Sequence, residues 1–370
     1  MMKKFILLFS IALSIPVFIN AQTTDNKVKF GGRIMYDMAT WGADKFDNTG
    51  SEFRRVRLYS SGTMYSNVNY KLQLDFAGGK IAFKDVWMEL GELPINGKLR
   101  VGHFKEPLRL EVLTSSKYIP FMERSLVTSM FADRNTGAMY HTTFGDRLAF
   151  QSGVFRERDS FGNDKTANNN VNITSRVTYL AINNDGKLLH LGASNSLRKN
   201  NDNTYDLSTK AENHLGNKLI DATFKDITES TVFGWELAYI NGSLSLQGEY
   251  LQTTLIGETE TKLSGFYGQV SYFLTGENRP YKNSLDGFGR VSPYNNYGSG
   301  DKGAIELVAR ISQICLQKAG EGQLNDITVG LNWYLNPNTR VMLNYVMGEM
   351  TKGTEVTIEN AVMMRVQLDF

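Results

Sequence analysis

The segment from His103 to Gly137 reads HFKEPLRLEVLTSSKYIPFMERSLVTSMFADRNTG and is flanked on both sides by short strand-like runs. A connection of roughly thirty residues between two strands is uncommon in a compact domain unless it has a function. This connection carries both apolar residues and cations, namely Leu108, Leu110, Val112, Leu113, Tyr118, Ile119, Phe121 and Met122 together with Lys105, Arg109, Lys117, Arg124 and Arg134. Such a segment must pack against a surface and still present charge to water. The inside of a β-barrel offers both, so we interpret residues 105–136 as a constriction loop folded into a pore.

The last ten residues, 361–370, read AVMMRVQLDF and show the pattern of a barrel strand. The residues of one face alternate with those of the other: Val362, Met364, Val366, Leu368 and Phe370 against Met363, Arg365, Gln367 and Asp369. This period of two is typical of a strand with one lipid face and one lumen face. The edge of a soluble β-sandwich could alternate in the same way, but it would not explain the terminal Phe370. A final strand that ends in an aromatic residue also resembles the signal read by the bacterial barrel-assembly machinery, which we expect as a partner.

Similar runs recur along the whole chain, and about sixteen can be counted against the barrel template. They begin near Val28, Phe53, Asn69, Lys80, Gly97, Gly137, Arg147, Val171, Lys187, Thr231, Ser243, Lys262, Gly303, Asn325, Thr339 and Asn360. The prolines outside the first twenty residues all fall between these runs, as expected because proline removes a ladder hydrogen bond. The predicted fold class is therefore all-β: a transmembrane antiparallel β-barrel of about sixteen strands, with inward-folded constriction loops.

The beginning of the chain predicts export. Two lysines precede an apolar stretch, residues 5–19, and Ala21 then offers a small residue before a cleavage site. This order is typical of a secretory signal peptide. A membrane anchor is the alternative, but the stretch is shorter than the roughly 20 residues that a spanning helix needs, and Pro16 interrupts it. We expect a leader at residues 1–21, a barrel domain at 22–370, and a location in the bacterial outer membrane in contact with its lipid.

Composition excludes several other classes of function. The chain carries 40 Lys and Arg against 38 Asp and Glu, and losing Lys3 and Lys4 with the leader makes the two counts equal. Nucleic-acid binding needs a surplus of cations, so no nucleic-acid partner is expected. Cys315 is the only cysteine, so no internal disulfide can form. The four histidines, His103, His141, His190 and His214, form no HExxH pair and flank no GxSxG elbow, so we expect neither an enzyme nor a cofactor or metal site.

The connections between the runs alternate in length. If the first strand runs outward, every second connection lies on the periplasmic side, where barrels have short turns. Most of these connections are tight, such as Asn241-Gly242, but the one at residues 276–302 is long and mixes cations with aromatic residues. We expect this turn to fold into the periplasmic mouth of the barrel. The outer connection at residues 199–230 is long and mixed, and its pattern leaves its placement open.

The same alternation predicts which cations face the lumen. In the second strand Val56 and Leu58 should face lipid, so Arg55 and Arg57 face inward, and Arg54 points outward near the rim or into a neighbouring subunit. By the same rule, further cations line the lumen: Lys71, Arg100, Arg176, Arg310 and Arg365. Guanidinium groups bind oxyanions bidentately, and rings of charge set permeation, so a pore narrowed by Arg and Lys favours anions. The alternative is that these cations form salt bridges within the wall, with Asp75, Asp85, Glu89, Glu306 and Asp369 as partners.

The constriction loop adds donors of two kinds. Ser115 and Ser116 offer hydroxyl and backbone donors beside Lys117, and Arg124 follows eight residues after Ser116. Mixed neutral and charged donors suit an oxyanion that accepts several hydrogen bonds. An ordinary polar turn is the alternative interpretation.

Several stretches together resemble the phosphate-selective porin O and P family: FRRVRLYSSG, GHFKEPLRLEVLTSSKYIPFMERSL, LSLQGEY, GFYGQVSYFLTGENRPY, FGRVSP, GAIELVARIS and LNWYLNPNTRVMLNYV. The resemblance implies a sixteen-stranded outer-membrane barrel, usually a homotrimer, whose inserted loops form an anion-selective eyelet. It also implies that the residues of this eyelet are Ser115, Ser116 and Arg124 from the loop, Asp85 from the wall, and Arg54 with Arg55 from the second strand.

This chain departs from the family pattern in two respects. Residues 171–199 hold only Arg176 and Arg198 where the family carries a ladder of closely spaced lumen arginines, and the family's loop lysine has no match other than Lys117 on the far side of the serines. The resemblance therefore supports a preference for anions more firmly than strict selectivity for phosphate.

The predicted function is a porin through which anions, phosphate or polyphosphate first among them, diffuse passively past an eyelet lined by Arg and Lys. A general or weakly selective diffusion channel for small solutes is the main alternative. A non-conducting outer-membrane scaffold and a barrel enzyme are two further hypotheses.

Overall fold

The structure is a computed structural model that describes residues 27–163, 170–200, 203–298 and 300–370. The expected leader at residues 1–21 lies outside these residues. No helix within the described part of the chain is both long enough and apolar enough to cross a membrane.

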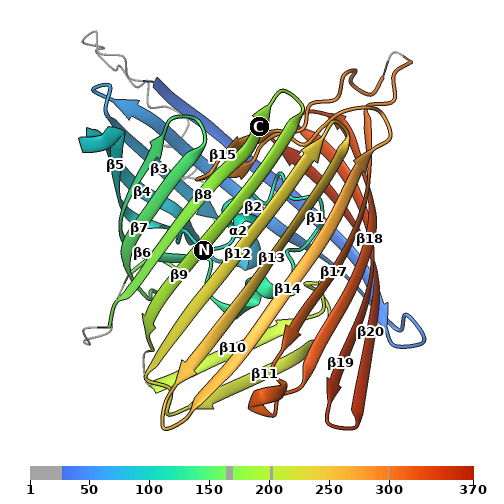
Figure 1. The fold of residues 1–370 in the computed structure, drawn as a ribbon. Helices are drawn as coiled ribbons and strands as arrows, with labels where there is room; N and C mark the ends of the chain where they lie inside the picture. Colours follow the sequence, from blue (N-terminus) through green and yellow to red (C-terminus); the bar gives the residue numbers. More distant parts are fainter. Residues whose placement is uncertain (1–26, 164–169, 201–202, 299) are drawn as a thin grey trace, which may run out of the picture.

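Sixteen antiparallel strands form a closed barrel (Figure 1), which confirms the predicted fold class. The strands of the barrel are β1 (Lys27–Gly42), β2 (Asn48–Met64), β3 (Val68–Asp75), β4 (Ala82–Leu93), β5 (Gly97–Lys105), β6 (Arg134–Phe144), β7 (Leu148–Arg156), β8 (Asn172–Asn184), β9 (Lys187–Lys199), β12 (Glu229–Asn241), β13 (Leu244–Ile256), β14 (Glu260–Phe273), β17 (Ala304–Cys315), β18 (Gln323–Asn336), β19 (Thr339–Lys352) and β20 (Glu355–Asp369). Each of the sixteen predicted runs corresponds to one of them. The first and last strands pair along ten residues and close the sheet, leaving no free edge.

The side chains alternate along the strands as the sequence predicts. In β20, Val366 and Leu368 are exposed on the outside, whereas Arg365, Gln367 and Asp369 are buried on the inside. Successive residues of a strand point to opposite faces, so one face meets lipid and the other meets the lumen.

Tight turns connect the strands at one end of the barrel. Gly242, between β12 and β13, has a φ of 55°, a left-handed conformation that glycine adopts without steric cost and that two-residue hairpins require. By the length rule for outer-membrane barrels this end is periplasmic, and the C-terminus lies at the same end (Figure 1).

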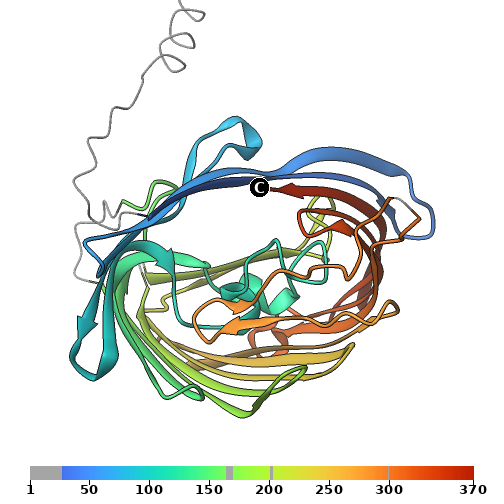
Figure 2. The same ribbon diagram turned by 90° about the horizontal axis from the view of Figure 1, so that it is seen from above.

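The connection between β5 and β6 lies inside the barrel, as the view along the barrel shows (Figure 2). It contains a short helix, α2 (Leu110–Leu113), and a 3₁₀ turn, η3 (Leu126–Met130). In the described part of the chain, three further 3₁₀ turns lie in connections between strands: η1 (Ala77–Gly79), η2 (Pro94–Asn96) and η5 (Gln317–Ala319). We call residues 106–133 the inserted loop.

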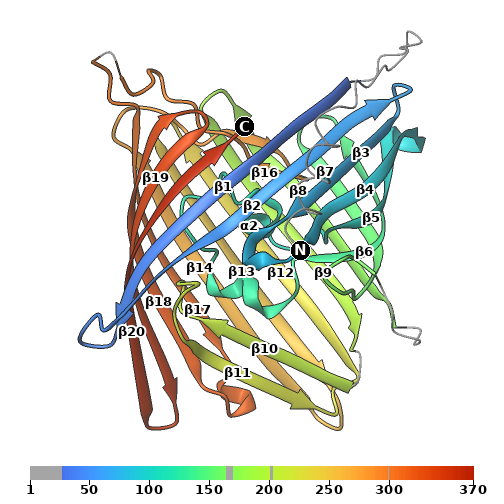
Figure 3. The same ribbon diagram turned by 180° about the vertical axis from the view of Figure 1, so that it is seen from behind.

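Two more segments fold into the lumen. The outer connection after β9 forms a hairpin of β10 (Thr204–Lys210) and β11 (Lys218–Lys225), which runs across the outer end of the barrel (Figure 3). The long periplasmic turn forms a second small hairpin, β15 (Tyr281–Asn283) with β16 (Gly287–Phe288). The backbone N–H of Phe288 donates to Thr114 Oγ1 at 3.3 Å, so this turn reaches the inserted loop from the periplasmic side.

An apolar core fills the lumen on one side of the barrel. The inserted loop, the β10–β11 hairpin and the inner faces of several strands between β12 and β19 contribute to it: Leu108, Leu126, Val127, Met130, Tyr205, Leu207, Ile220, Ala222, Ile227, Val232, Leu251, Leu255, Leu263, Tyr267, Ile314, Leu316, Leu324 and Met350. Burying each large side chain contributes about 1.5–3 kcal/mol. The core therefore holds the inserted loop and the β10–β11 hairpin against the wall between β12 and β19.

Candidate functional site

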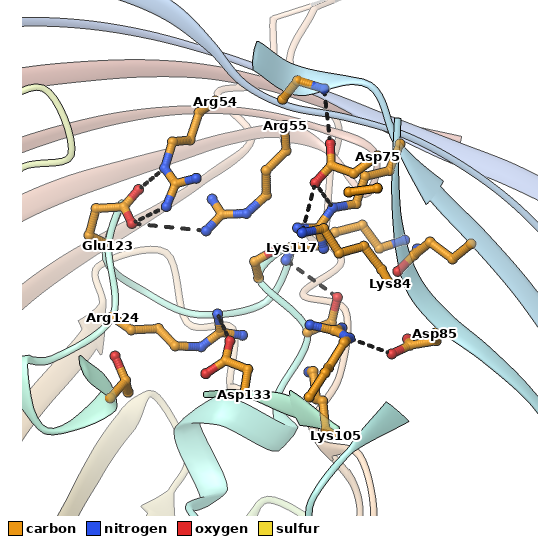
Figure 4. Close-up of a pocket in the computed structure, with 18 of the residues that line it drawn as sticks. Arg54, Arg55, Asp75, Lys84, Asp85, Lys105, Lys117, Glu123, Arg124 and Asp133 are labelled. Atoms are coloured by element: carbon orange, nitrogen blue, oxygen red, sulfur yellow. Dashed lines mark hydrogen bonds and ion pairs between the residues drawn. The ribbon is translucent and has the colours of Figure 1, made fainter. Parts of the chain in front are cut away.

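A cavity of about 1160 Å³ lies between the inserted loop and the wall formed by β1–β5. Among the described residues that line it, fifteen are Arg or Lys and seven are Asp or Glu. Figure 4 shows that these charges come from two sides, with Arg54, Arg55 and Asp85 on the strands and Lys117, Glu123 and Arg124 on the loop. Because low-dielectric walls focus the field of unbalanced charge, this surplus favours anions within the cavity.

Arg54 and Arg55 both point into the cavity, which corrects the prediction that Arg54 faces outward. Phe53 pairs with Tyr36 and Arg55 pairs with Met35, so β2 has one extra residue opposite two consecutive residues of β1. This β-bulge interrupts the alternation and lets two neighbouring side chains share one face. The family resemblance, which implied that both arginines belong to the site, agrees with this arrangement, whereas strict alternation could not produce it.

The carboxylate of Glu123, on the inserted loop, contacts both arginines of the bulge. This carboxylate accepts two hydrogen bonds from Arg54, at 2.8 and 2.9 Å, and lies 3.9 Å from Arg55 Nη2. Arg365 of β20 donates a further hydrogen bond at 2.9 Å. Burial alone would raise the pKa of Glu123, but the positive charges of Arg54, Arg55 and Arg365 outweigh burial and hold this pKa well below its ordinary value. Glu123 is therefore ionised at neutral pH.

The serine pair lies where the inserted loop meets β1. Arg33 of β1 donates from Nη1 to Ser116 Oγ at 2.7 Å, and Ser115 also lines the cavity. Lys117 Nζ donates to Asp369 of β20 at 2.9 Å, while Arg290 of the periplasmic turn binds the same carboxylate. A hydroxyl, a guanidinium and an ammonium thus converge from the loop and the wall.

Arg124 combines exposure to the cavity with bonds inside the loop. Its guanidinium donates to the carbonyl oxygens of Glu111, Val112 and Thr114, at 3.1, 3.3 and 2.9 Å. Its Nη1 lies 3.6 Å from Asp133 Oδ2. Burial would raise the pKa of Asp133, but the neighbouring guanidinium groups, that of Arg124 foremost, lower it below its ordinary value. Arg124 therefore both presents charge to the cavity and stabilises the shape of the loop.

The remaining predicted residues of the strands lie in pairs of opposite charge along the wall. The cations Arg57, Lys71 and Arg100 contact Asp75, Asp85 and Glu89, at 2.7, 2.7 and 2.6 Å. Asp85 also accepts a hydrogen bond from Arg134 at 2.8 Å. All of these cations line the cavity, so the structure combines the two interpretations of the sequence: the cations face the lumen and also form salt bridges.

Arg176, Arg310 and Arg365 are not among the described residues that line the cavity, although all three point inward. Inserted segments cover them. Arg176 binds Glu236 and the carbonyl of Ser284 in the periplasmic turn.

Arg310 and Arg365 reach the other two inserts. Arg310 binds Glu111 of the inserted loop and Glu212 of the β10–β11 hairpin, whereas Arg365 binds Asp37 and Glu123. Each of these three buried arginines, Arg176, Arg310 and Arg365, thus joins the wall to an insert.

Eight cations of the described lining were not predicted as site residues: Arg33, Lys84, Lys105, Arg134, Arg158, Lys210, Lys218 and Lys282. Of these, Lys105 and Arg134 were already named as cations of the constriction loop. Arg33 lies directly opposite Arg57 in the pairing of β1 with β2, so only the strand register places it at the site. Lys105 donates to the carbonyl oxygens of Leu113 and Thr114 at 2.9 and 3.3 Å, a contact that depends on the folding of the loop. Among the described residues, no three His, Cys, Asp or Glu side chains lie close enough together to bind a metal ion.

Comparisons with known proteins agree with this architecture. A family model described as phosphate-selective porin O and P matches residues 28–370. Porin O of Pseudomonas aeruginosa is 26% identical over 381 residues, which cover 90% of this chain and 85% of that protein.

Solved structures share the fold. An anion-selective porin from Comamonas acidovorans superimposes with a TM-score of 0.60 at 15% identity, covering 94% of this chain and 100% of that one. The in-vitro folded trimer form of OmpT from Vibrio cholerae gives a TM-score of 0.59 at 11% identity and covers 93% of this chain and 99% of that one. Because the family model spans nearly all of the chain from β1 onward, this protein belongs to the phosphate-selective porin O and P family of outer-membrane channels and is not an enzyme.

Proposed function

We propose that this porin conducts small oxyanions by passive diffusion through the cavity between the inserted loop and the β1–β5 wall, and that phosphate or polyphosphate is its substrate. The observation that carries the proposal is the surplus of fifteen cations over seven acids among the described residues of the lining. Charged rings of one sign select permeating ions of the other sign.

The chemistry of the lining supports an oxyanion rather than a halide. The lining offers both neutral and charged donors, namely Arg33, Arg54, Arg55, Ser116 and Lys117. Guanidinium groups bind phosphate oxygens in pairs, and hydroxyl groups add directional hydrogen bonds. The description of the family as phosphate-selective supports the same choice.

A weakly selective channel for small solutes is the second candidate. One observation favours it: Arg54, Arg57, Lys71, Arg100 and Lys117 each lie within 3 Å of a carboxylate, which reduces their pull on a passing anion. The two candidate functions differ in how strongly the lining cations, after pairing with carboxylates, still attract a permeating anion.

Planar-bilayer recordings of the purified protein separate the two. The oxyanion pathway requires greater permeability to chloride than to potassium, together with block of the chloride current by phosphate. Equal permeability to both ions and no block by phosphate would favour the weakly selective channel.

We also infer that three copies assemble in the membrane. The trimer form of OmpT, which shares this fold, supports the inference. Native mass spectrometry of the detergent-extracted protein tests it, and a monomer at all protein concentrations would refute it.

A further inference from the structure

The carboxylate of Glu123 lies where a permeating oxyanion would meet the arginine pair of the bulge. Arg54 holds it through Nε and Nη2, at 2.8 and 2.9 Å, which is the bidentate geometry that a guanidinium also offers to phosphate. Arg365 Nη2 adds a third bond at 2.9 Å, and Arg55 Nη2 lies 3.9 Å away. The site therefore already contains an anion, and that anion is part of the protein.

This ion pair remains accessible from the cavity. About 14% of the Glu123 side chain and 20% of the Arg54 side chain are exposed, and both residues line the open space. Figure 4 shows Arg54 and Arg55 extending from the wall toward Glu123 on the loop. An anion in the cavity can therefore approach the same guanidinium groups that Glu123 occupies.

We propose that Glu123 is a tethered competitor for the permeating anion and that it limits how tightly the Arg54–Arg55 pair binds phosphate. The inference rests on the proposed function and identifies a residue that sets its affinity. Conduction requires that each site bind an ion strongly enough to admit it and weakly enough to release it. Two adjacent guanidinium groups without a counter-charge would hold a dianion tightly, and the Glu123 carboxylate prevents this.

A purely mechanical role would lead to a different outcome. The loop near Glu123 is held by other bonds as well: the carbonyl oxygens of Ile119, Met122 and Glu123 itself accept hydrogen bonds from Arg340, Arg365 and Arg310. These backbone contacts do not need the Glu123 side chain. Replacing only its charge should therefore leave the loop in place and change the affinity of the site.

The test compares Glu123→Gln with the unmodified protein in planar bilayers. We expect the phosphate concentration that halves the chloride current to fall by about tenfold or more, because a unit charge is removed within a few ångströms of the arginines. The chloride-to-potassium permeability ratio should rise, and the current at high phosphate should fall. Unchanged block with an unchanged ratio would overturn the inference, as would weaker block with a larger, noisier current, which is the result expected of a loosened loop.

Two further variants sharpen the test. The double variant Arg54→Gln/Glu123→Gln should lose the higher affinity for phosphate that Glu123→Gln gains. A double-mutant cycle over the two residues measures how strongly their effects on phosphate block depend on each other. Asp133→Asn removes the same unit charge from the same cavity, but its contacts with Arg109 and Arg124 are longer, at 3.8 and 3.6 Å. We expect this control to change phosphate block by less than about threefold, since long and partly exposed ion pairs contribute little. Equal effects of the two acid substitutions would refute a specific role for Glu123.

The same recordings separate the inference from the proposed function. If the unmodified protein shows no phosphate block but Glu123→Gln raises the chloride-to-potassium ratio severalfold, the oxyanion pathway fails and the competitor role stands. If the unmodified protein is blocked by phosphate and Glu123→Gln is blocked at the same concentration, the pathway stands and the competitor role fails.

Discussion

Replacing Arg310 by methionine tests whether the buried arginines anchor the inserted segments or bind the permeating anion. Arg310 extends from β17, and its side chain is fully buried. Its Nη1 lies 3.0 Å from Glu111 Oε1 of the inserted loop, its Nε lies 2.9 Å from Glu212 Oε2 of the β10–β11 hairpin, and its Nη2 donates to the carbonyl oxygen of Glu123 at 2.9 Å. One side chain therefore joins the wall to two inserts.

The expected loss of docking free energy follows from the carboxylates that Arg310→Met leaves without a cation. Removing one partner of a buried ion pair costs about 3–5 kcal/mol, because the remaining charge stays buried without compensation. In Arg310→Met the carboxylates of Glu111 and Glu212 both lose their cation. Since about 1.4 kcal/mol corresponds to a factor of ten, undocking of the inserted loop should become roughly 10²- to 4 × 10³-fold more populated. The barrel should persist, because its backbone ladder does not involve this side chain.

Three measurements check this expectation. In planar bilayers the variant should show a larger and noisier current with lower selectivity for anions. Limited trypsin digestion should cleave the loop after Lys117 or Arg124, which are protected in the unmodified protein. Heat-dependent migration in denaturing gels should remain that of a folded barrel.

Control variants decide between the two roles. Arg100→Gln removes a cation that lines the cavity and pairs with Glu89 of the wall, so it should lower selectivity without enlarging the current. Adding Glu111→Gln and Glu212→Gln to Arg310→Met should restore much of the docking, because no uncompensated charge is then buried. A normal current and an intact loop in Arg310→Met, combined with weaker phosphate block, would refute the anchoring argument and make Arg310 an anion ligand.

Three other predictions concern the site and its support. Arg124→Ala should weaken phosphate block severalfold while the barrel still folds; unchanged block in bilayers would count against Arg124 as part of the eyelet. Deleting Arg54 should remove the bulge and keep every other side chain of β2 on its present face, whereas deleting Val56 should reverse one half of the strand and abolish the heat-modifiable barrel. The ordinary pKa of a Glu side chain is about 4.3, and the pKa of Glu123 lies below it. The docking free energy of its ion pairs is therefore present above about pH 4.3 and is lost only as the pH falls through the lower, folded-state pKa. The chloride currents of the unmodified protein and of Glu123→Gln should therefore change with pH in parallel between about pH 8 and pH 5, and a change within that range that occurs only in the unmodified protein would contradict the ionised state.

The barrel itself was predictable because alternation repeats sixteen times and the errors of single runs do not accumulate. The C-terminal strand illustrates this: Val366 and Leu368 are exposed, and Arg365 and Asp369 are buried, as the period of two requires. The β10–β11 hairpin was not placed, because its pattern alone does not reveal which surface it meets.

The arrangement of the site was less predictable, since alternation gives the face of a residue but not what covers that face. Arg310 and Lys71 both point inward, yet the first lies beneath two inserts and the second lines the cavity. The bulge at Arg54 depends on a register shift between two strands, and the position of Arg33 depends on the same pairing. These features are properties of two segments together, so no single stretch of sequence encodes them.

The junction of β1 and β20, where the barrel closes, has a consequence for biogenesis. Arg33 and Asp37 belong to the first strand, Arg365 and Asp369 belong to the last, and the inserted loop is fastened to both strands through Ser116, Lys117 and Glu123. Neither strand alone provides all of the contacts that hold the inserted loop in place. During membrane insertion the narrow passage can thus form only after the two ends of the sheet have met. A newly made chain should pass through a stage in which its pore is wide and not ion-selective. Substitutions that weaken the junction of β1 and β20 should leave such a pore even when every residue that lines the cavity is unchanged.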